Sequence, residues 1–164
     1  MLTPQAALAD VQPLRVPYNG LKGDYQAIQL LTPTANGFPW LARLVGTSFS
    51  NQPSGATYTL AGGDLPYILA HFDHQSRLLR MEAINVTTGK NWGRVVDLPY
   101  LGRNSTGFFS FVWDGVTTNG SGKTSTVPNG QYVIKVSVAK ELGDAANPAD
   151  VETWTSPVIT LARP

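Results

Sequence analysis

Apolar and polar side chains alternate along two stretches of this chain. In residues 131–138 every second position is apolar, namely Tyr132, Ile134, Val136 and Val138. Residues 77–86 repeat the pattern, with Leu79, Met81 and Ala83 apolar and the charged Arg80 and Glu82 between them. A period of two puts one set of side chains on a buried face and the other set in water. Both stretches are therefore predicted to be half-buried β-strands.

Clusters of Gly, Pro, Asn and Asp separate further stretches rich in apolar and β-branched residues, as turns separate strands. Additional strands are predicted over residues 14–18, 25–31, 56–60, 66–72, 93–98 and 153–161. Residues 38–45 fit either a strand or a short helix. Residues 1–13 are predicted to be an extended lead-in, and residues 48–55 and 141–150 to be loops.

The segment spanning residues 109–138 contains two apolar and aromatic runs with a polar stretch between them. The first run ends at Trp113 and is followed by the turn residues Asp114 and Gly115. The second run is preceded by the turn tripeptide Pro128-Asn129-Gly130. This arrangement predicts a β-hairpin with a long loop.

About eight to ten short strands at a spacing of roughly ten residues are typical of a β-sandwich. The predicted fold is an all-β, antiparallel β-sandwich of the fibronectin type III or immunoglobulin-like kind, with little helix. A length of 164 residues fits one domain covering residues 1–164. A weak domain boundary, if one exists, is expected near residues 48–55.

Composition narrows the function classes. The net charge is +1, only 14% of the residues are charged, and the basic residues are scattered. Without a basic stripe, nucleic acid and membrane surfaces are not expected as partners. No apolar run approaches the roughly 18 residues of a spanning helix. The chain has no cysteine, which excludes disulfides and thiol catalysis.

Three Asn-X-Ser/Thr sequons begin at Asn85, Asn104 and Asn119. Such sequons are acceptor sites for N-linked glycans in secreted eukaryotic proteins. Together with the Ser-, Thr- and Gly-rich composition, they favour a secreted, extracellular glycoprotein.

The tripeptide Gly46-Thr47-Ser48 is similar to the segment that carries the nucleophile of subtilisin-like proteases. In those enzymes the serine opens a helix and a histidine takes its proton. The following residues here are rich in Ser, Pro and Gly and do not favour that helix. The tripeptide is therefore predicted to lie in a loop, and no catalytic triad or enzymatic activity is expected.

The two histidines of the chain lie together in His71-Phe72-Asp73-His74. On a strand, His71 and Asp73 share one face and His74 lies on the other. A metal site needs three or four ligands that converge. We therefore expect hydrogen-bonded polar residues at a strand end, with no metal and no cofactor.

Four tryptophans are candidates for ligand contact, because an exposed aromatic ring stacks on the apolar face of a sugar. Trp92 lies in a polar stretch and is predicted to be an exposed turn residue. Trp113 ends an apolar run and is predicted to be core, whereas Trp154 fits either location. The candidate binding residues are Trp92, Trp154, Asn119 and Lys123.

Four stretches, spread over nearly the whole chain, resemble the C-terminal region of fungal subtilisin-like serine proteases of the minor extracellular protease type. They are Val16-Pro17-Tyr18 within residues 16–25, His71-Phe72-Asp73-His74-Gln75, Trp113-Asp114-Gly115 with residues 127–132, and Glu152-Thr153-Trp154-Thr155-Ser156-Pro157. The third of these is shared with unrelated sandwich modules, so it supports the fold more than the family.

The resemblance implies a non-catalytic accessory region that follows a protease domain and acts in binding or stabilisation. In that family, strands of a first fibronectin-like domain precede the Val16-Pro17-Tyr18 stretch, and they are absent from this sequence. The chain is thus expected to be an excised region or a free-standing descendant. The alternative function is that of a free-standing carbohydrate-binding lectin. Expected partners are glycans, a protease domain, or a second copy paired along an exposed sheet edge.

Overall fold

The computed structural model describes residues 23–24 and 27–164, which form two β-sheets. The four-stranded sheet contains, in spatial order, β2 (Ser48–Asn51), β1 (Trp40–Val45), β4 (Pro66–Ala70) and β7 (Phe109–Val112). The eight-stranded sheet contains β3 (Ala56–Tyr58), β12 (Ile159–Leu161), β10 (Gly130–Lys140), β5 (Ser76–Asn85), β6 (Asn91–Leu101), β8 (Val116–Thr118) and β9 (Thr124–Thr126), and β11 (Val151–Thr155) also pairs with β10.

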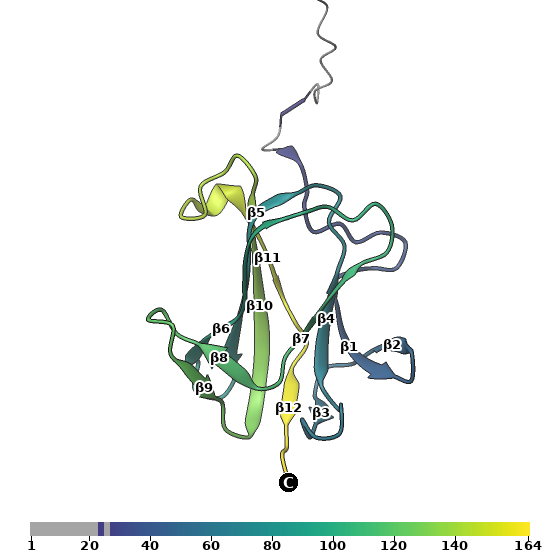
Figure 1. The fold of residues 1–164 in the computed structure, drawn as a ribbon, viewed down its shortest axis with the longest axis vertical. Coiled ribbons are helices and arrows are strands. Elements are labelled where there is room, and N and C mark those ends of the chain that lie inside the picture. Colours follow the sequence, from purple (N-terminus) through teal and green to yellow (C-terminus); the bar gives the residue numbers. More distant parts are fainter. Residues whose placement is uncertain (1–22, 25–26) are drawn as a thin grey trace, which may run out of the picture.

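The two sheets face each other as the layers of a sandwich (Figure 1). Neighbouring strands run antiparallel throughout, apart from β3 and β12, which run parallel. The predicted all-β sandwich is therefore confirmed. In the described residues, no helix has the length and apolar character needed to cross a membrane.

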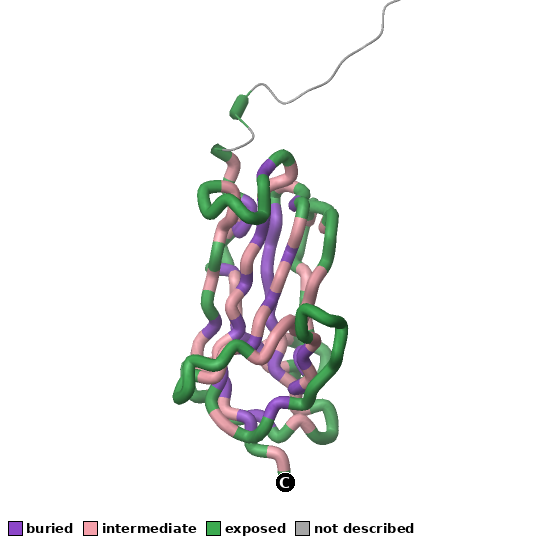
Figure 2. Tube along the Cα trace, turned by 90° about the vertical axis from the view of Figure 1, so that its left-hand side faces the viewer, coloured by how far each residue is buried: buried purple, intermediate pink, exposed green. Residues whose placement is uncertain are grey.

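The core lies between the sheets and is built by the alternation seen in the sequence. Along the strands, buried positions are interleaved with more exposed ones (Figure 2). The predicted inward positions of β5 and β10 are each at most 1% exposed, and they are Leu79, Met81, Ala83, Tyr132, Ile134, Val136 and Val138. Both predicted strands and their buried faces are confirmed.

The predicted long-looped hairpin over residues 109–138 is wrong. β7 pairs with β4 in one sheet, whereas β10 pairs with β5, β11 and β12 in the other. The intervening polar stretch forms a small hairpin of its own, β8 with β9. The two apolar runs meet through side chains instead, since the Trp113 ring packs edge-on against Tyr132 with centroids 5.6 Å apart.

The predicted loop over residues 48–55 is wrong in its first half, which is strand β2. Val45 pairs with Ser48 across the two-residue turn Gly46-Thr47, and Gly46 has a φ of 61°. Glycine supplies positive φ in such hairpin turns without steric cost. Residues 38–45, which fitted a strand or a helix, contain strand β1.

The predicted final strand is divided into β11 and β12 by Ser156-Pro157-Val158. Residues 141–150 form the predicted loop, which ends in a short 3-10 helix, Pro148–Asp150. In the described part of residues 25–31 there is no strand, only an isolated bridge between Leu31 and Phe72. The predictions for residues 1–13 and 14–18 lie outside the described residues.

Candidate functional site

The outer surface of the four-stranded sheet carries a second apolar cluster. Alternation along β1 and β4 sends Leu41 and Ile68 into the main core, and Ala42 and Leu69 to the opposite side. Aromatic side chains surround this outer pair. We call the group the aromatic face, and it consists of Phe38, Trp40, Phe49, Tyr67 and Phe108.

The rings of the aromatic face touch one another in tilted and edge-on arrangements. The Phe38 centroid lies 5.0 Å from that of Trp40 and 5.3 Å from that of Phe108. The Phe49 centroid lies 5.1 Å from that of Tyr67 and 5.7 Å from that of Phe108. These are the separations at which aromatic pairs attract. The face is thus a fixed surface, and Phe108 remains 40% exposed.

A cleft of about 390 Å³ opens between these rings and has polar groups on its rim. Its apolar lining comes from Phe38, Trp40, Phe49, Leu69 and Phe108, and its polar lining from Asn36, Thr47 and Ser48. The Trp40 indole N–H is not available to a ligand, because it donates to the Asn36 carbonyl at 2.9 Å. Apolar walls with a few polar groups are the usual make-up of a ligand cleft.

A neighbouring cleft of about 420 Å³ contains Trp154, which the sequence offered as either core or exposed. Phe38 lines both clefts, so the two adjoin. Trp154 is half-buried and packs against the core. The Glu152 carboxylate lines the same cleft, and it accepts the backbone N–H groups of Leu30 at 2.7 Å and Leu31 at 2.9 Å.

The prediction of Trp92 as an exposed turn residue is wrong. Trp92 is half-buried in strand β6 and packs against the core. One face of its ring is covered by Lys90, whose Nζ lies 3.6 Å from the ring centroid. Trp113 is core, as predicted, at 2% exposure, and its indole donates to the Val116 carbonyl.

Asn119 and Lys123 lie in the exposed turn between β8 and β9. The Asn119 side-chain oxygen accepts from the N–H and hydroxyl of Ser121 and from the N–H of Lys123. These bonds close the turn and leave that oxygen occupied. The sheet order places β10 and β5 between Trp154 on β11 and Trp92 on β6. The four candidate residues therefore do not form one site.

The three sequon asparagines differ in their surroundings. Asn85 and Asn104 are half-buried, and their side-chain oxygens accept from Thr88 and from the Phe72 N–H respectively. Asn119 is exposed. Glycosylation stays a prediction, with Asn119 the most accessible acceptor of the three.

The histidine stretch is a hydrogen-bonded strand end, as predicted. His71 is 8% exposed, and its ring nitrogens lie 2.6 Å from the Gly107 carbonyl and 3.0 Å from the Asp73 carboxylate. The Gly107 bond raises the pKa of His71, desolvation lowers it, and the Asp73 bond and charge raise it further. Within the described part of the chain, no three His, Cys, Asp or Glu side chains are grouped for metal binding.

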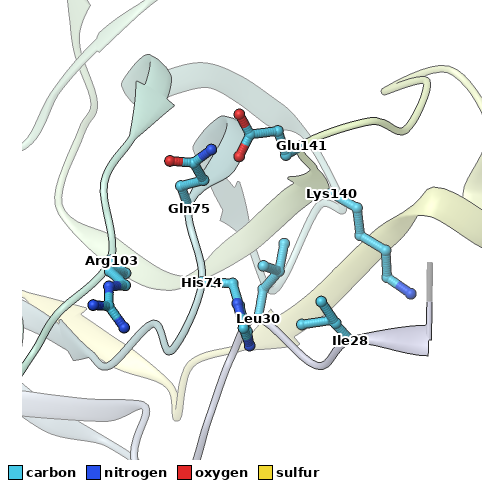
Figure 3. Close-up of a pocket in the computed structure, with 7 residues that line it drawn as sticks. All are labelled: Ile28, Leu30, His74, Gln75, Arg103, Lys140 and Glu141. Atoms are coloured by element: carbon cyan, nitrogen blue, oxygen red, sulfur yellow. The ribbon is translucent and has the colours of Figure 1, made fainter. Parts of the chain in front are cut away.

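Ser48 begins the edge strand β2 instead of a helix, so the local geometry of a subtilisin-like nucleophile is not formed. A third cleft, of about 260 Å³, brings together His74, Gln75, Arg103, Lys140 and Glu141. Figure 3 shows Arg103 and Lys140 on opposite sides of it. Its cationic groups therefore do not converge on one ligand position.

No protein-family model matches this chain, and no curated protein matches it. The resemblance to subtilisin-like proteases and the secreted location both stay predictions. Sequence reasoning did not find the aromatic face. Phe49 and Phe108 lie far along the chain from Phe38 and Trp40 and from each other. The signal that the sequence did carry was the spacing of Phe38 and Trp40, which are two residues apart and share a face if residues 38–45 form a strand.

Proposed function

We propose that this chain is a non-catalytic binding module of a secreted protein, and that the aromatic face is its binding surface. The observation that carries the proposal is the gathering of five aromatic rings on the outer side of a sheet whose inner side already covers the core. The outer side of an antiparallel sheet is ordinarily polar. Aromatic rings there are typical of a surface that contacts another molecule.

The first candidate partner is a folded protein domain, as the resemblance to subtilisin-like proteases implies. Trp, Tyr and Phe are the side chains most enriched at protein interfaces, and all three types occur on the aromatic face. The interlocked rings are held in place before binding, so little side-chain entropy is lost on association. The module would then position or stabilise a protease domain.

The second candidate ligand is carbohydrate, and the rim of the aromatic cleft favours it. Asn36, Thr47 and Ser48 are exposed beside the rings of Trp40 and Phe108. Sugar rings present C–H groups to an aromatic face and hydroxyls to polar side chains. This combination supports a lectin, with the aromatic cleft in place of the predicted Trp92 site.

Replacement of Phe108 by alanine tests the proposal. We expect Phe108→Ala to weaken binding at least about tenfold, since truncation of a hot-spot aromatic residue costs about 2 kcal/mol or more. The probes are a glycan array and a purified fungal subtilisin-like catalytic domain. The affinity for each probe that binds is then measured by calorimetry. Tyr100→Ala is the matched control, because Tyr100 is 75% exposed and lies off the aromatic face.

Saturable glycan binding that is lost in Phe108→Ala and kept in Tyr100→Ala supports the lectin. Binding of the catalytic domain with the same variant pattern supports the accessory module. Binding that survives Phe108→Ala but disappears in Trp92→Ala would show that the binding site lies at Trp92, as predicted from the sequence. No binding in either arm would overturn the proposed function.

A further inference from the structure

Residues 102–108 form a strap that leads from β6 in one sheet to β7 in the other. The strap is fixed at two points to the residues that follow β4. At the first point, Asn104 donates its N–H to the Phe72 carbonyl at 2.8 Å and accepts the Phe72 N–H at 3.0 Å. At the second point, the Gly107 carbonyl lies 2.6 Å from His71 Nδ1. Only the second attachment involves a group that titrates near neutral pH.

Both ring nitrogens of His71 face groups that only accept hydrogen bonds. The Gly107 carbonyl has no proton to give, and an ionised Asp73 carboxylate at 3.0 Å from Nε2 has none either. A neutral imidazole has a single N–H and can satisfy one of them, whereas an imidazolium satisfies both. The geometry thus selects the doubly protonated ring of a residue that is 8% exposed.

The charges around this ring are few. Asp73 faces Nε2 and is itself hydrogen-bonded by Thr32, from the segment before β1. The charge of His74 acts on Asp73, whereas Arg103, the charged residue of the strap, lines the third cleft beside His74. The pKa of His71 is raised, with the Gly107 bond as the largest cause, and the pKa of Asp73 is lowered, chiefly by its bond to His71.

The strap leads directly into the aromatic face. Gly107 precedes Phe108, whose ring lies against Phe38 and Phe49 and forms one wall of the aromatic cleft. The hydrogen-bonded carbonyl of Gly107 therefore belongs to the residue directly before Phe108, and a change in this bond acts next to a wall of the cleft. By contrast, the attachment at Asn104 lies three residues before Gly107, and neither of its hydrogen bonds involves a group that titrates.

We propose that His71 is a pH-sensitive latch, which holds the strap and the Phe108 wall of the aromatic cleft in place while its ring carries both protons. A neutral ring keeps one N–H, and when that proton stays on Nε2 toward Asp73, the Gly107 carbonyl loses its bond from His71. Of the two attachments, the strap then keeps the one at Asn104. As regulation of binding, the latch rests on the proposed function. As a property of the strap, it stands on the hydrogen bonds themselves.

The direction of the pH effect follows from the raised pKa. A histidine whose pKa is higher in the folded state stabilises the fold fully at pH below its unfolded value, about 6.5. That stabilisation disappears as pH rises through the higher folded value. The cleft is therefore fixed in mildly acidic solution and loosened in alkaline solution.

Nuclear magnetic resonance on the full chain tests the latch without any ligand. We expect the backbone amides of Gly107 and Phe108 to shift with a midpoint above pH 6.5 that coincides with titration of the His71 ring. The same shift should remain in His74→Gln, the matched control, and be lost in His71→Gln. A glutamine at position 71 does not titrate and has a single nitrogen to donate from.

Amide shifts at residues 107–108 that persist in His71→Gln would overturn the latch, as would titration of His71 with no response at those amides. Should His71→Gln fail to fold, the ring nitrogens of the unaltered protein decide the matter. A ring that is still mainly doubly protonated at pH 6.5 supports the latch, and a ring that is mainly neutral at that pH refutes it. None of these readouts depends on glycan or protease binding, so failure of the proposed function is distinguishable.

Discussion

At the scale of single residues, Ser156 shows how one side chain maintains a strand ladder that the backbone interrupts. The chain leaves the β10 edge between β11 and β12, where Pro157 has no N–H to contribute. Ser156 Oγ accepts the Ile134 N–H at 2.9 Å and donates to the Pro157 carbonyl, and its own N–H donates to the Ile134 carbonyl. The hydroxyl thus takes the place of a missing carbonyl partner.

Replacement of Ser156 by alanine should lower the free energy of unfolding by about 1–3 kcal/mol, the cost of leaving a buried N–H without an acceptor. The measurement is urea unfolding followed by tryptophan fluorescence. Thr155→Ala is the control, because Thr155 is exposed and next in sequence. Equal stability of Ser156→Ala and the control would show that the hydroxyl is replaced by water.

At the scale of elements, β10 organises the eight-stranded sheet. It pairs with β5 along one edge and with β11 and β12 along the other. Its inward side chains are buried, and its outward ones, such as Lys135 and Ser137, are half-buried on the solvent side. The Tyr132 hydroxyl reaches back to the Pro128 carbonyl at 2.9 Å, which closes the turn before the strand.

The alternation along β10 can be tested with two neighbouring residues. Ile134→Ala should lower the free energy of unfolding by about 2–5 kcal/mol, because the change leaves a cavity in the core. Lys135→Ala, one residue further along and on the opposite face, should change it by less than about 1 kcal/mol. Thermal and urea unfolding of both variants provide the measurement. Comparable losses in the two variants would contradict the assignment of faces.

At the scale of the whole molecule, three aspartates in separate parts of the sandwich connect stability to acid pH. Asp97 accepts hydrogen bonds from Arg80 and Arg94. Asp64 accepts from Thr59 and forms an ion pair with Arg43, and Asp73 is bonded to His71. Desolvation alone would raise the pKa of Asp64 and Asp97, but these bonds and the arginine charges lower both. The pKa of Asp73 is also lowered, by His71 first.

A lowered carboxylate pKa stabilises the fold above the unfolded value, about 3.9, and this contribution is lost as pH falls through the folded value. The free energy of unfolding should therefore decrease below about pH 4. Urea unfolding at a series of pH values measures this decrease. Asp97→Asn should make the acid limb shallower, because one of the three titrating groups is removed. An unchanged slope in that variant would show that Asp97 titrates alike in both states.

His71 acts in the opposite sense to the three aspartates, since its raised pKa makes it stabilising on the acid side of its titration. Its loss of stabilisation occurs as pH rises above about 6.5. These four groups together favour greatest stability in the mildly acidic range, between the aspartate and histidine titrations.

Much of the fold was determined by the sequence through short-range patterns. Alternation in residues 77–86 and 131–138 identified two central strands and their buried faces, because side-chain direction in a strand depends only on position along it. The turn residues Asp114 and Gly115 correctly marked the end of one strand, since they lie between β7 and β8. The histidine stretch was also predicted well, since neighbours two residues apart can bond without help from the rest of the chain.

Strand partners and surfaces were decided only by the tertiary structure. Strands β7 and β8 are separated only by the turn at Asp114 and Gly115, yet they belong to different sheets, because β7 pairs with β4 and β8 pairs with β6 and β9. The burial of the Trp92 ring under Lys90 likewise depends on the position that Lys90 takes after the turn. Neither fact follows from local periodicity, because periodicity carries no information on which strands pair with each other.

The aromatic face shows most clearly what only the tertiary structure determines. Each of its rings has an ordinary sequence context, and only the pairing of β1, β2 and β4 and the course of the strap bring them together. The sequence determined that the chain folds as stacked sheets, because burial repeats at the period of a strand. The tertiary structure determined where a ligand surface and its histidine latch lie, because both are built from contacts between residues far apart in the chain.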